Sequence, residues 1–142
     1  MKLMISRCAA ALALAGTVLA GTACTDDDSP TGPSVSEVVG NYAATRLTAT
    51  SVLGTQDILQ AGGSLTMQFA SSGALTGHIT VPSESVNEDF AGTWKIEDGE
   101  IEIEQVAADT FVEDLTFTLV RNTLVADEFF DGVRVRATLT RQ

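Results

Sequence analysis

The sequence predicts an all-β fold, an antiparallel up-and-down meander of about eight strands. Three observations support this class. Apolar and polar residues alternate with a period of two through most of the chain after residue 37. Gly or Asp-Gly separates most of these runs, in gaps short enough for antiparallel hairpins rather than crossovers. No window in this region holds the i, i+3, i+4, i+7 pattern of an amphipathic helix for long.

Each expected strand is a run in which apolar side chains fall on alternate positions, so that one face is buried. Thr and Val are abundant in these runs, as is usual for half-buried strands. The expected strands cover residues 40–50, 64–70, 74–81, 89–97, 100–106, 111–120, 123–129 and 133–140. Residues 51–63 are expected to form a long loop that can cover one end of the sheet.

The clearest hairpin turns at Asp98-Gly99, a dipeptide typical of type I′ turns because both central positions need φ > 0. This two-residue loop fixes the register of the strands on either side. The expected cross-strand pairs are Trp94 with Ile103, Lys95 with Glu102, and Ile96 with Ile101. The apolar pairs then share the core face, and the ion pair lies on the wet face, where such pairs contribute about 0.2–1 kcal/mol.

Two further hairpins are expected at residues 121–122 and 131–132. The second of these places Glu128 opposite Val135, which conflicts with the apolar alternation of the last strand. We therefore predict a bulge near residues 127–129, because one extra residue would restore the phase.

Eight strands in about 100 residues leave two sheet edges that must be protected from pairing with other chains. Closing the meander into a barrel removes both edges. A β-sandwich only shortens them and stays the alternative, although the Cys–Trp–Cys pattern of immunoglobulin domains is missing from the sequence.

The first 23 residues have the pattern of a secretory signal. Lys2 and Arg7 form a positive start, and an uncharged run rich in Ala and Leu follows over residues 8–20. That run is too short for a transmembrane helix, which needs about 20 apolar residues. Residues 24–36 are rich in Asp, Pro, Ser and Thr and predict a flexible acidic tether. Residues 37–142 are the predicted β-domain.

The stretch Ala20-Gly21-Thr22-Ala23-Cys24 resembles the lipobox of bacterial lipoproteins. This resemblance implies cleavage before Cys24 and attachment of a diacylglyceryl group to its thiol. Thr25 follows the cysteine, where Asp would be an inner-membrane retention signal, so the resemblance implies an outer-membrane anchor facing the periplasm. The alternative is a secreted protein in which Cys24 stays a free thiol.

The charge and the residue inventory exclude several classes of function. The net charge is −11, and nucleic-acid recognition needs a basic face, so we expect no nucleic-acid partner. His78 is the only histidine and alternates with exposed positions, so we expect it on the surface. No CxxC pair, phosphate-binding loop or nucleophile–base constellation is apparent. We therefore expect no metal, no cofactor and no enzymatic activity.

The layout of the predicted domain resembles the small lipocalin-like barrels found among bacterial lipoproteins. Gly40-Asn41-Tyr42 opens the first strand, with Tyr42 where that family has Trp, and the chain ends in Leu139-Thr140-Arg141. The resemblance implies that Arg141 packs against Tyr42 at the closed end of a barrel.

One apolar face of the predicted sheet lines the barrel interior, which eight strands either fill with side chains or leave open for one small ligand. The residues expected to line a ligand or to form the core are Tyr42, Met67, Phe69, Leu75, Trp94, Ile96, Ile103, Phe117 and Leu119. Two functions follow. One is an envelope lipoprotein that binds a small apolar ligand inside the barrel. The other is a structural or interaction lipoprotein with a filled core and an acidic surface for a protein partner.

Overall fold

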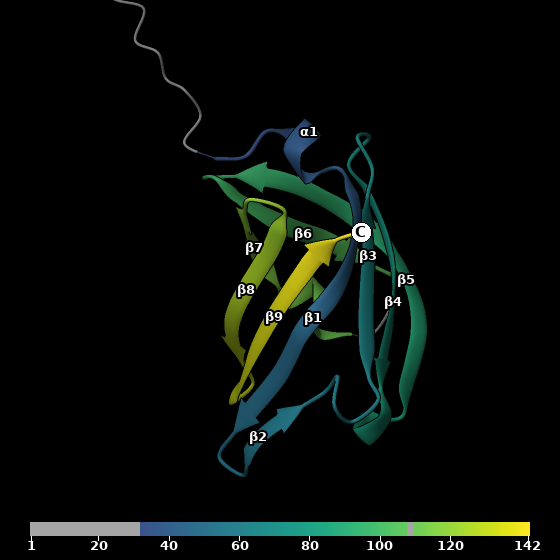
Figure 1. Ribbon diagram of the computed structural model, residues 1–142, viewed down its shortest axis with the longest axis vertical. Helices are drawn as coiled ribbons and strands as arrows, with labels where there is room; N and C mark the ends of the chain where they lie inside the picture. The colour runs from purple at the N-terminus through teal and green to yellow at the C-terminus, as the bar shows by residue number, and fades with distance from the viewer. Residues whose placement is uncertain (1–31, 108–109) are drawn as a thin grey trace, which may run out of the picture.

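The computed structural model describes residues 32–107 and 110–142, and these residues form one antiparallel sheet (Figure 1). The strands are β1 (Gly40–Ser51), β2 (Gly54–Asp57), β3 (Ser64–Phe69), β4 (Ala74–Val81), β5 (Val86–Glu97), β6 (Glu100–Val106), β7 (Thr116–Val120), β8 (Thr123–Phe130) and β9 (Val133–Arg141). The helices are short: α1 (Val35–Val38) and the 3-10 turns η1 (Pro82–Glu84) and η2 (Phe111–Asp114). Helix α1 overlaps the last two residues of the predicted tether.

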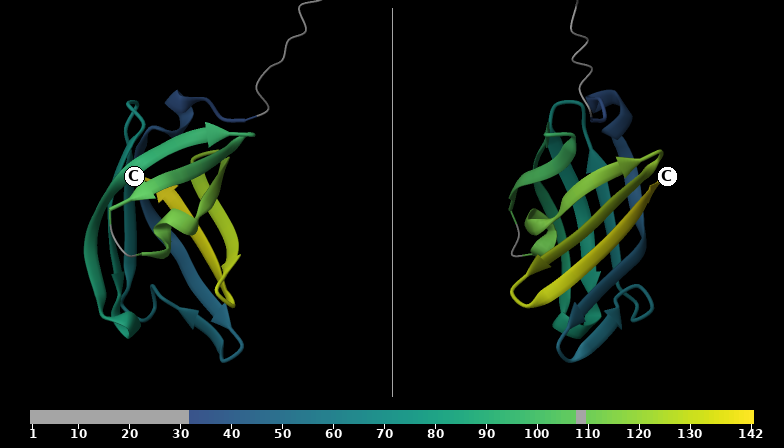
Figure 2. Two further views of the ribbon diagram at one scale, coloured as in Figure 1. Left: turned by 180° about the vertical axis from the view of Figure 1, so that it is seen from behind. Right: turned by 90° about the vertical axis from the view of Figure 1, so that its left-hand side faces the viewer.

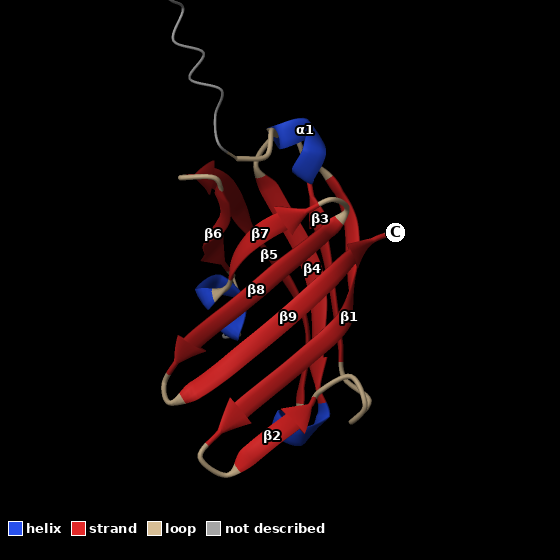
Figure 3. Ribbon diagram, turned by 60° about the vertical axis from the view of Figure 1, so that its left-hand side comes forward, coloured by secondary structure: helices blue, strands red, loops and turns tan. Residues whose placement is uncertain are grey.

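The sheet closes into a barrel of eight strands, as the sequence predicts. Each strand from β3 to β9 pairs with its neighbour in the chain, and β9 returns to pair with β1, which also pairs with β3. Figure 3 shows β8, β9, β1 and β2 lying side by side across this closure. The short strand β2 is not one of these eight strands. It pairs antiparallel with the last four residues of β1.

The register of the Asp98-Gly99 hairpin is confirmed. Asp98 has φ 51° and Gly99 φ 84°, as a type I′ turn requires. Trp94 lies opposite Ile103, Lys95 opposite Glu102, and Ile96 opposite Ile101. Lys95 Nζ contacts Glu97 and lies 3.3 Å from Glu102 and 3.4 Å from Glu104. Its hydrogen bond to Glu97, followed by that to Glu102, raises the pKa of Lys95.

Two expected segments differ from the structure. The segment 111–120 begins not as a strand but as η2, where the Thr110 hydroxyl accepts a hydrogen bond from the Val112 amide at 3.4 Å. The adjacent exposed pair Glu113 and Asp114 breaks the alternation that a strand needs. The loop expected at 51–63 contains β2, which the Thr50 and Thr55 hydroxyls, 2.9 Å apart, join to β1.

The predicted bulge at residues 127–129 is wrong. Strands β8 and β9 pair without interruption, and Glu128 does lie opposite Val135. The reason is visible on the outer face, where Arg134 Nε donates to Asp127 at 2.6 Å and Arg136 Nε donates to it at 3.1 Å. These charge-assisted bonds hold the register, and Glu128 stays half-buried on the inward-facing side.

The closed end of the barrel is sealed by Tyr42 and Arg141, as the resemblance implies. The Tyr42 hydroxyl donates to the Val38 carbonyl at 2.8 Å and accepts from Arg141 Nη2 at 2.7 Å. The guanidinium carbon lies 5.3 Å from the centre of the Tyr42 ring, within cation–π range. The same Nη2 donates to the Glu37 carbonyl. The last strand is thereby tied to both α1 and β1.

Aromatic rings fill the barrel next to this seal. Tyr42 and Phe69 meet edge to face with centroids 5.6 Å apart, and Phe69 meets Trp94 in the same way at 5.4 Å. The Trp94 indole N–H donates to the Ala70 carbonyl at 3.0 Å, so its buried polar atom is satisfied. The closed half of the barrel is therefore a packed core.

Replacing Tyr42 by Phe should destabilise the barrel, because the Val38 carbonyl and Arg141 Nη2 both lose the Tyr42 hydroxyl. A buried group left without its partner costs about 1–3 kcal/mol, and we expect a loss of that size in urea unfolding followed by circular dichroism. Thr118→Val, which removes an exposed hydroxyl from β7, is the control. Equal stability of the two variants would contradict this account of the seal.

Replacing Asp127 by Asn should make the stability less dependent on pH. Hydrogen bonding from Arg134 lowers the pKa of Asp127 in the folded state. The carboxylate therefore stabilises the fold above the unfolded-state pKa of about 3.9, and this stabilisation is lost as pH falls through the lower folded-state pKa. Thermal unfolding should give a higher Tm for the parent at pH 7, with the two curves converging towards pH 2. Asp114→Asn is the control, and a pH-independent gap would contradict the assignment.

Candidate functional site at the open end of the barrel

The end of the barrel opposite α1 is formed by the β1–β2 hairpin, η1 and the β8–β9 turn (Figure 2). We call this end the mouth. Thr50 pairs with Arg134, which brings the β1–β2 hairpin beside the β8–β9 turn, and Glu84 of η1 lines the same hollow as Asp131 of that turn. The packed aromatic core lies at the other end.

Three adjoining hollows occupy the mouth. The innermost, of about 150 Å³, is lined by Ala49, Ile58, Val81, Glu84, Phe111, Phe130, Asp131, Val133 and Val135. A second, of about 110 Å³, shares Val81, Glu84 and Phe111 with it. A third, of about 370 Å³, lies towards the β1–β2 hairpin and shares Ala49, Glu84 and Val133 with the innermost one. The shared residues show that the three hollows adjoin one another.

The walls of the mouth come from segments that turn inward. Ile58 follows β2, and its amide donates to the Leu47 carbonyl at 2.9 Å, which holds the side chain at 3% exposure. Phe111 from η2 stacks on Phe130 from β8, with centroids 6.4 Å apart and an angle of 22° between the rings. The wall of the innermost hollow is mainly apolar, which is typical of small-molecule sites, whereas the third hollow has a largely polar lining.

The residues that sequence reasoning singled out to line a ligand or to form the core belong to the core. Seven of them belong to the buried core, namely Tyr42, Met67, Phe69, Leu75, Trp94, Ile103 and Phe117. Ile96 and Leu119 are partly buried against it. None of the nine lines the three mouth hollows. Their side chains pack within the core, and the hollows of the mouth are lined by other residues.

The mouth residues were missed because alternation gives the face of a strand but not its height in the barrel. One signal was present, the conflict between Glu128 and Val135. A charged residue can keep the inward-facing phase only where water still reaches it, so this conflict marks the unfilled end. Ile58 lies outside the alternating runs, and Phe111 was placed in the strand expected at 111–120, so neither residue carried such a signal.

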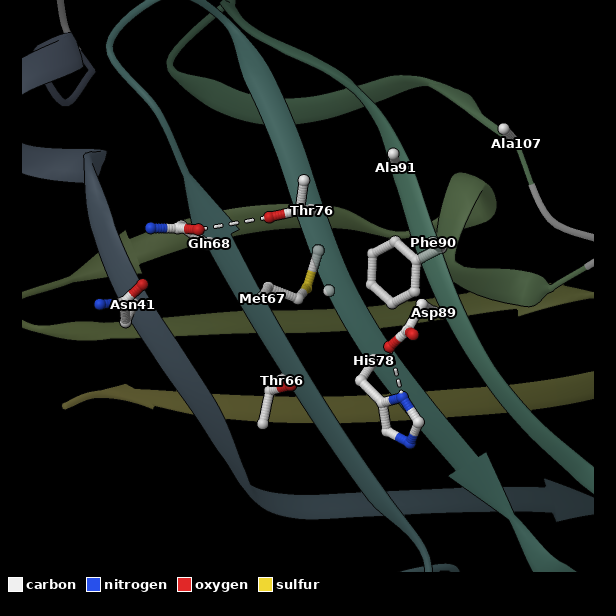
Figure 4. Close-up of a pocket in the computed structure, with 11 residues that line it drawn as sticks. Asn41, Thr66, Met67, Gln68, Thr76, His78, Asp89, Phe90, Ala91 and Ala107 are labelled. Atoms are coloured by element: carbon white, nitrogen blue, oxygen red, sulfur yellow. Dashed lines mark hydrogen bonds and ion pairs between the residues drawn. The ribbon is translucent and has the colours of Figure 1, made fainter.

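The outer face of β3, β4 and β5 carries a second, shallow groove of about 640 Å³ (Figure 4). Its lining combines the polar side chains of Thr66, Gln68, Thr76, His78 and Asp89 with the apolar side chains of Met67, Phe90, Ala91 and Ala107. Such a surface can form hydrogen bonds with a polar molecule, and it is more open to solvent than the mouth.

His78 lies in this groove, half-buried and ordered by its neighbours. Its Nδ1 is 2.8 Å from Asp89 Oδ1, and its Nε2 is 3.0 Å from Asn87 Oδ1 and 3.2 Å from the Thr80 hydroxyl. Both ring nitrogens thus face oxygen atoms of the protein. The arrangement accounts for His78 as part of a surface hydrogen-bond network.

Within residues 32–107 and 110–142, no group of three or more His, Cys, Asp or Glu side chains is placed to hold a metal ion. In the same part of the chain, no helix combines the length and the apolar character needed to cross a membrane. The exposed apolar side chains include three near the mouth: Val52 at 99%, Leu53 at 96% and Phe129 at 71% exposure.

Comparison of the chain with protein-family models, curated proteins and solved structures finds no match.

Proposed function

We propose that this protein is an exported lipoprotein, held at a bacterial outer membrane by lipid on Cys24, whose barrel binds a small apolar ligand at its mouth. The observation that carries the binding proposal is the uneven filling of the interior. The closed half is packed with Tyr42, Phe69 and Trp94, whereas the mouth keeps a mainly apolar hollow of about 150 Å³ next to a more polar one of about 370 Å³. Ligand pockets usually measure about 300–1,000 Å³, and the larger hollow lies within that range.

The proposed anchor and the mouth lie at opposite ends of the barrel. The chain enters the described structure at Gly32, against Gly99 in the β5–β6 turn of the closed end. The segment 24–31 can span at most about 29 Å when extended. An anchor on Cys24 would therefore keep the closed end near the bilayer and direct the mouth away from it, where a ligand can enter from the aqueous side.

A second candidate is an interaction protein that contacts an envelope partner. The observation that favours it is the exposure of Val52, Leu53 and Phe129 at the mouth, because large apolar side chains exposed together often mark contact surfaces. This function would not need the hollows. Filling the hollows therefore separates the two candidates.

Filling the mouth should weaken the binding of an apolar probe. We propose Ala49→Leu, because Ala49 lines two of the three hollows, with Ala74→Leu on the exposed start of β4 as the control. The probe is N-phenyl-1-naphthylamine, a neutral dye that brightens in apolar surroundings. Its own emission is the readout, because Trp94 lines none of the mouth hollows. We expect at least about tenfold weaker binding for Ala49→Leu and no change for Ala74→Leu.

The binding proposal fails if the dye does not bind the parent protein, or if it binds both variants alike. In that case, retention of an envelope partner by Ala49→Leu would favour the interaction protein.

Replacing Cys24 by Ser should release the protein from the membrane fraction, because the lipid would have no thiol to join. Metabolic labelling with an alkyne-tagged fatty acid should mark the parent and not the variant. Cys8→Ser, in the predicted signal segment, is the matched control and should keep both the label and the membrane location. Labelling that persists in Cys24→Ser would contradict the anchor.

A further inference from the structure

The mouth combines an apolar hollow with charge of one sign. Glu84, on η1, lines all three hollows, and Asp131, in the β8–β9 turn, lines the innermost one. Glu128 lies on the inward-facing side of β8 between Ala126 and Phe130, and it is half-buried. No Lys or Arg side chain lines any of these hollows.

The basic side chains near the mouth are engaged elsewhere. Arg134 donates to both carboxylate oxygens of Asp127, at 2.6 and 2.8 Å, and Arg136 donates to the same group on the outer face. In the part of the chain that the structure describes, Glu84, Glu128 and Asp131 form no ion pair. Among the described residues, the acidic rim thus has no ion-pair partner.

The apolar part of the mouth sets the size of what it can hold. A cavity of 150 Å³ with apolar walls accommodates a molecule of about the size of benzene. The innermost hollow has that volume, and Phe111 and Phe130 offer it stacked ring surfaces. Aromatic faces attract cations as well as apolar groups. The larger hollow beyond leaves room for a few more atoms towards η1 and Glu84.

From these observations we infer that the ligand is a small organic amine. Its aryl or short alkyl group occupies the innermost hollow against Phe111 and Phe130, and its ammonium lies at the rim beside Glu84 and Asp131. This inference rests on the proposed function, and it adds the chemical class of the ligand. The carboxylate of an apolar carboxylic acid would be repelled by the carboxylates at the same rim.

Three ligands that share one apolar group test the inference: 4-phenylbutylamine, 4-phenylbutanol and 4-phenylbutanoate, titrated into the protein at pH 7 by isothermal calorimetry. Exposed charge pairs contribute little individually, but attraction of the ammonium and repulsion of the carboxylate act together. We expect the amine to bind about tenfold more tightly than the carboxylate, with the alcohol between them.

The double variant Glu84→Gln, Asp131→Asn should bind the amine, the alcohol and the carboxylate with similar affinities. Its affinity for the alcohol should equal that of the parent. Both sites are exposed, and Asn suits the positive φ of 50° at position 131. The matched control is Asp98→Asn, Glu100→Gln, which makes the same change of net charge at the β5–β6 turn of the closed end. It should keep the order.

The outcomes separate this inference from the proposed function. If all three ligands bind with equal affinity, or if the control variant loses the order as fully as the mouth variant, the amine assignment is overturned and the binding site stands. If none of the three binds, the proposed binding function and the inference both fall.

Discussion

The pairing of β1 with β9 is the constraint on which the barrel depends. β1 is a strand of 12 residues that pairs with β3 near its start, with β9 along most of its length and with β2 near its end. A shift in register between Ala44 and Arg46 lets one strand serve these partners, because a bulge bends the strand and increases its twist. Without this pairing, β1 and β9 would be two open edges. At the closed end, Arg141 of β9 donates hydrogen bonds to the Tyr42 hydroxyl of β1 and to a backbone carbonyl of α1. The seal therefore joins α1 to the paired strands.

The interior has two halves with different physical character, one next to the seal and one at the mouth. The closed half is filled by aromatic rings in edge-to-face contact, with the indole N–H of Trp94 satisfied by a backbone carbonyl. The mouth has smaller side chains, a stacked phenylalanine pair and carboxylates at its rim. Dense packing at one end supplies rigidity, so the other end can leave apolar space open without losing the fold. The proposed binding site follows from this difference in packing between the closed half and the mouth.

Much of the fold could be predicted from the sequence, because the information is local. Asp98-Gly99 fixes a turn and hence a register, and the alternation of Val133, Val135, Ala137 and Leu139 fixes the face of the last strand. The limits of β7 and the existence of β2 depend on interactions that alternation does not encode, such as the Thr110 cap of η2 and the Thr50–Thr55 contact. The candidate site was harder still. Whether an inward residue lines packed or open space depends on how strands at both sides of the barrel meet, and Ile58 and Phe111 reach the mouth from outside the regular strands.

We propose that the mouth, and not the closed half, is where this barrel receives a ligand. The most direct measurement is a map of amide chemical-shift changes in the 15N-labelled protein during titration with 4-phenylbutylamine. We expect the amides of Val81, Phe111 and Val133, which belong to residues lining the hollows, to shift and saturate together, while those of Tyr42, Phe69 and Trp94 stay fixed. Shifts confined to the closed half or to the outer groove around His78, or no shifts at any amide, would contradict it.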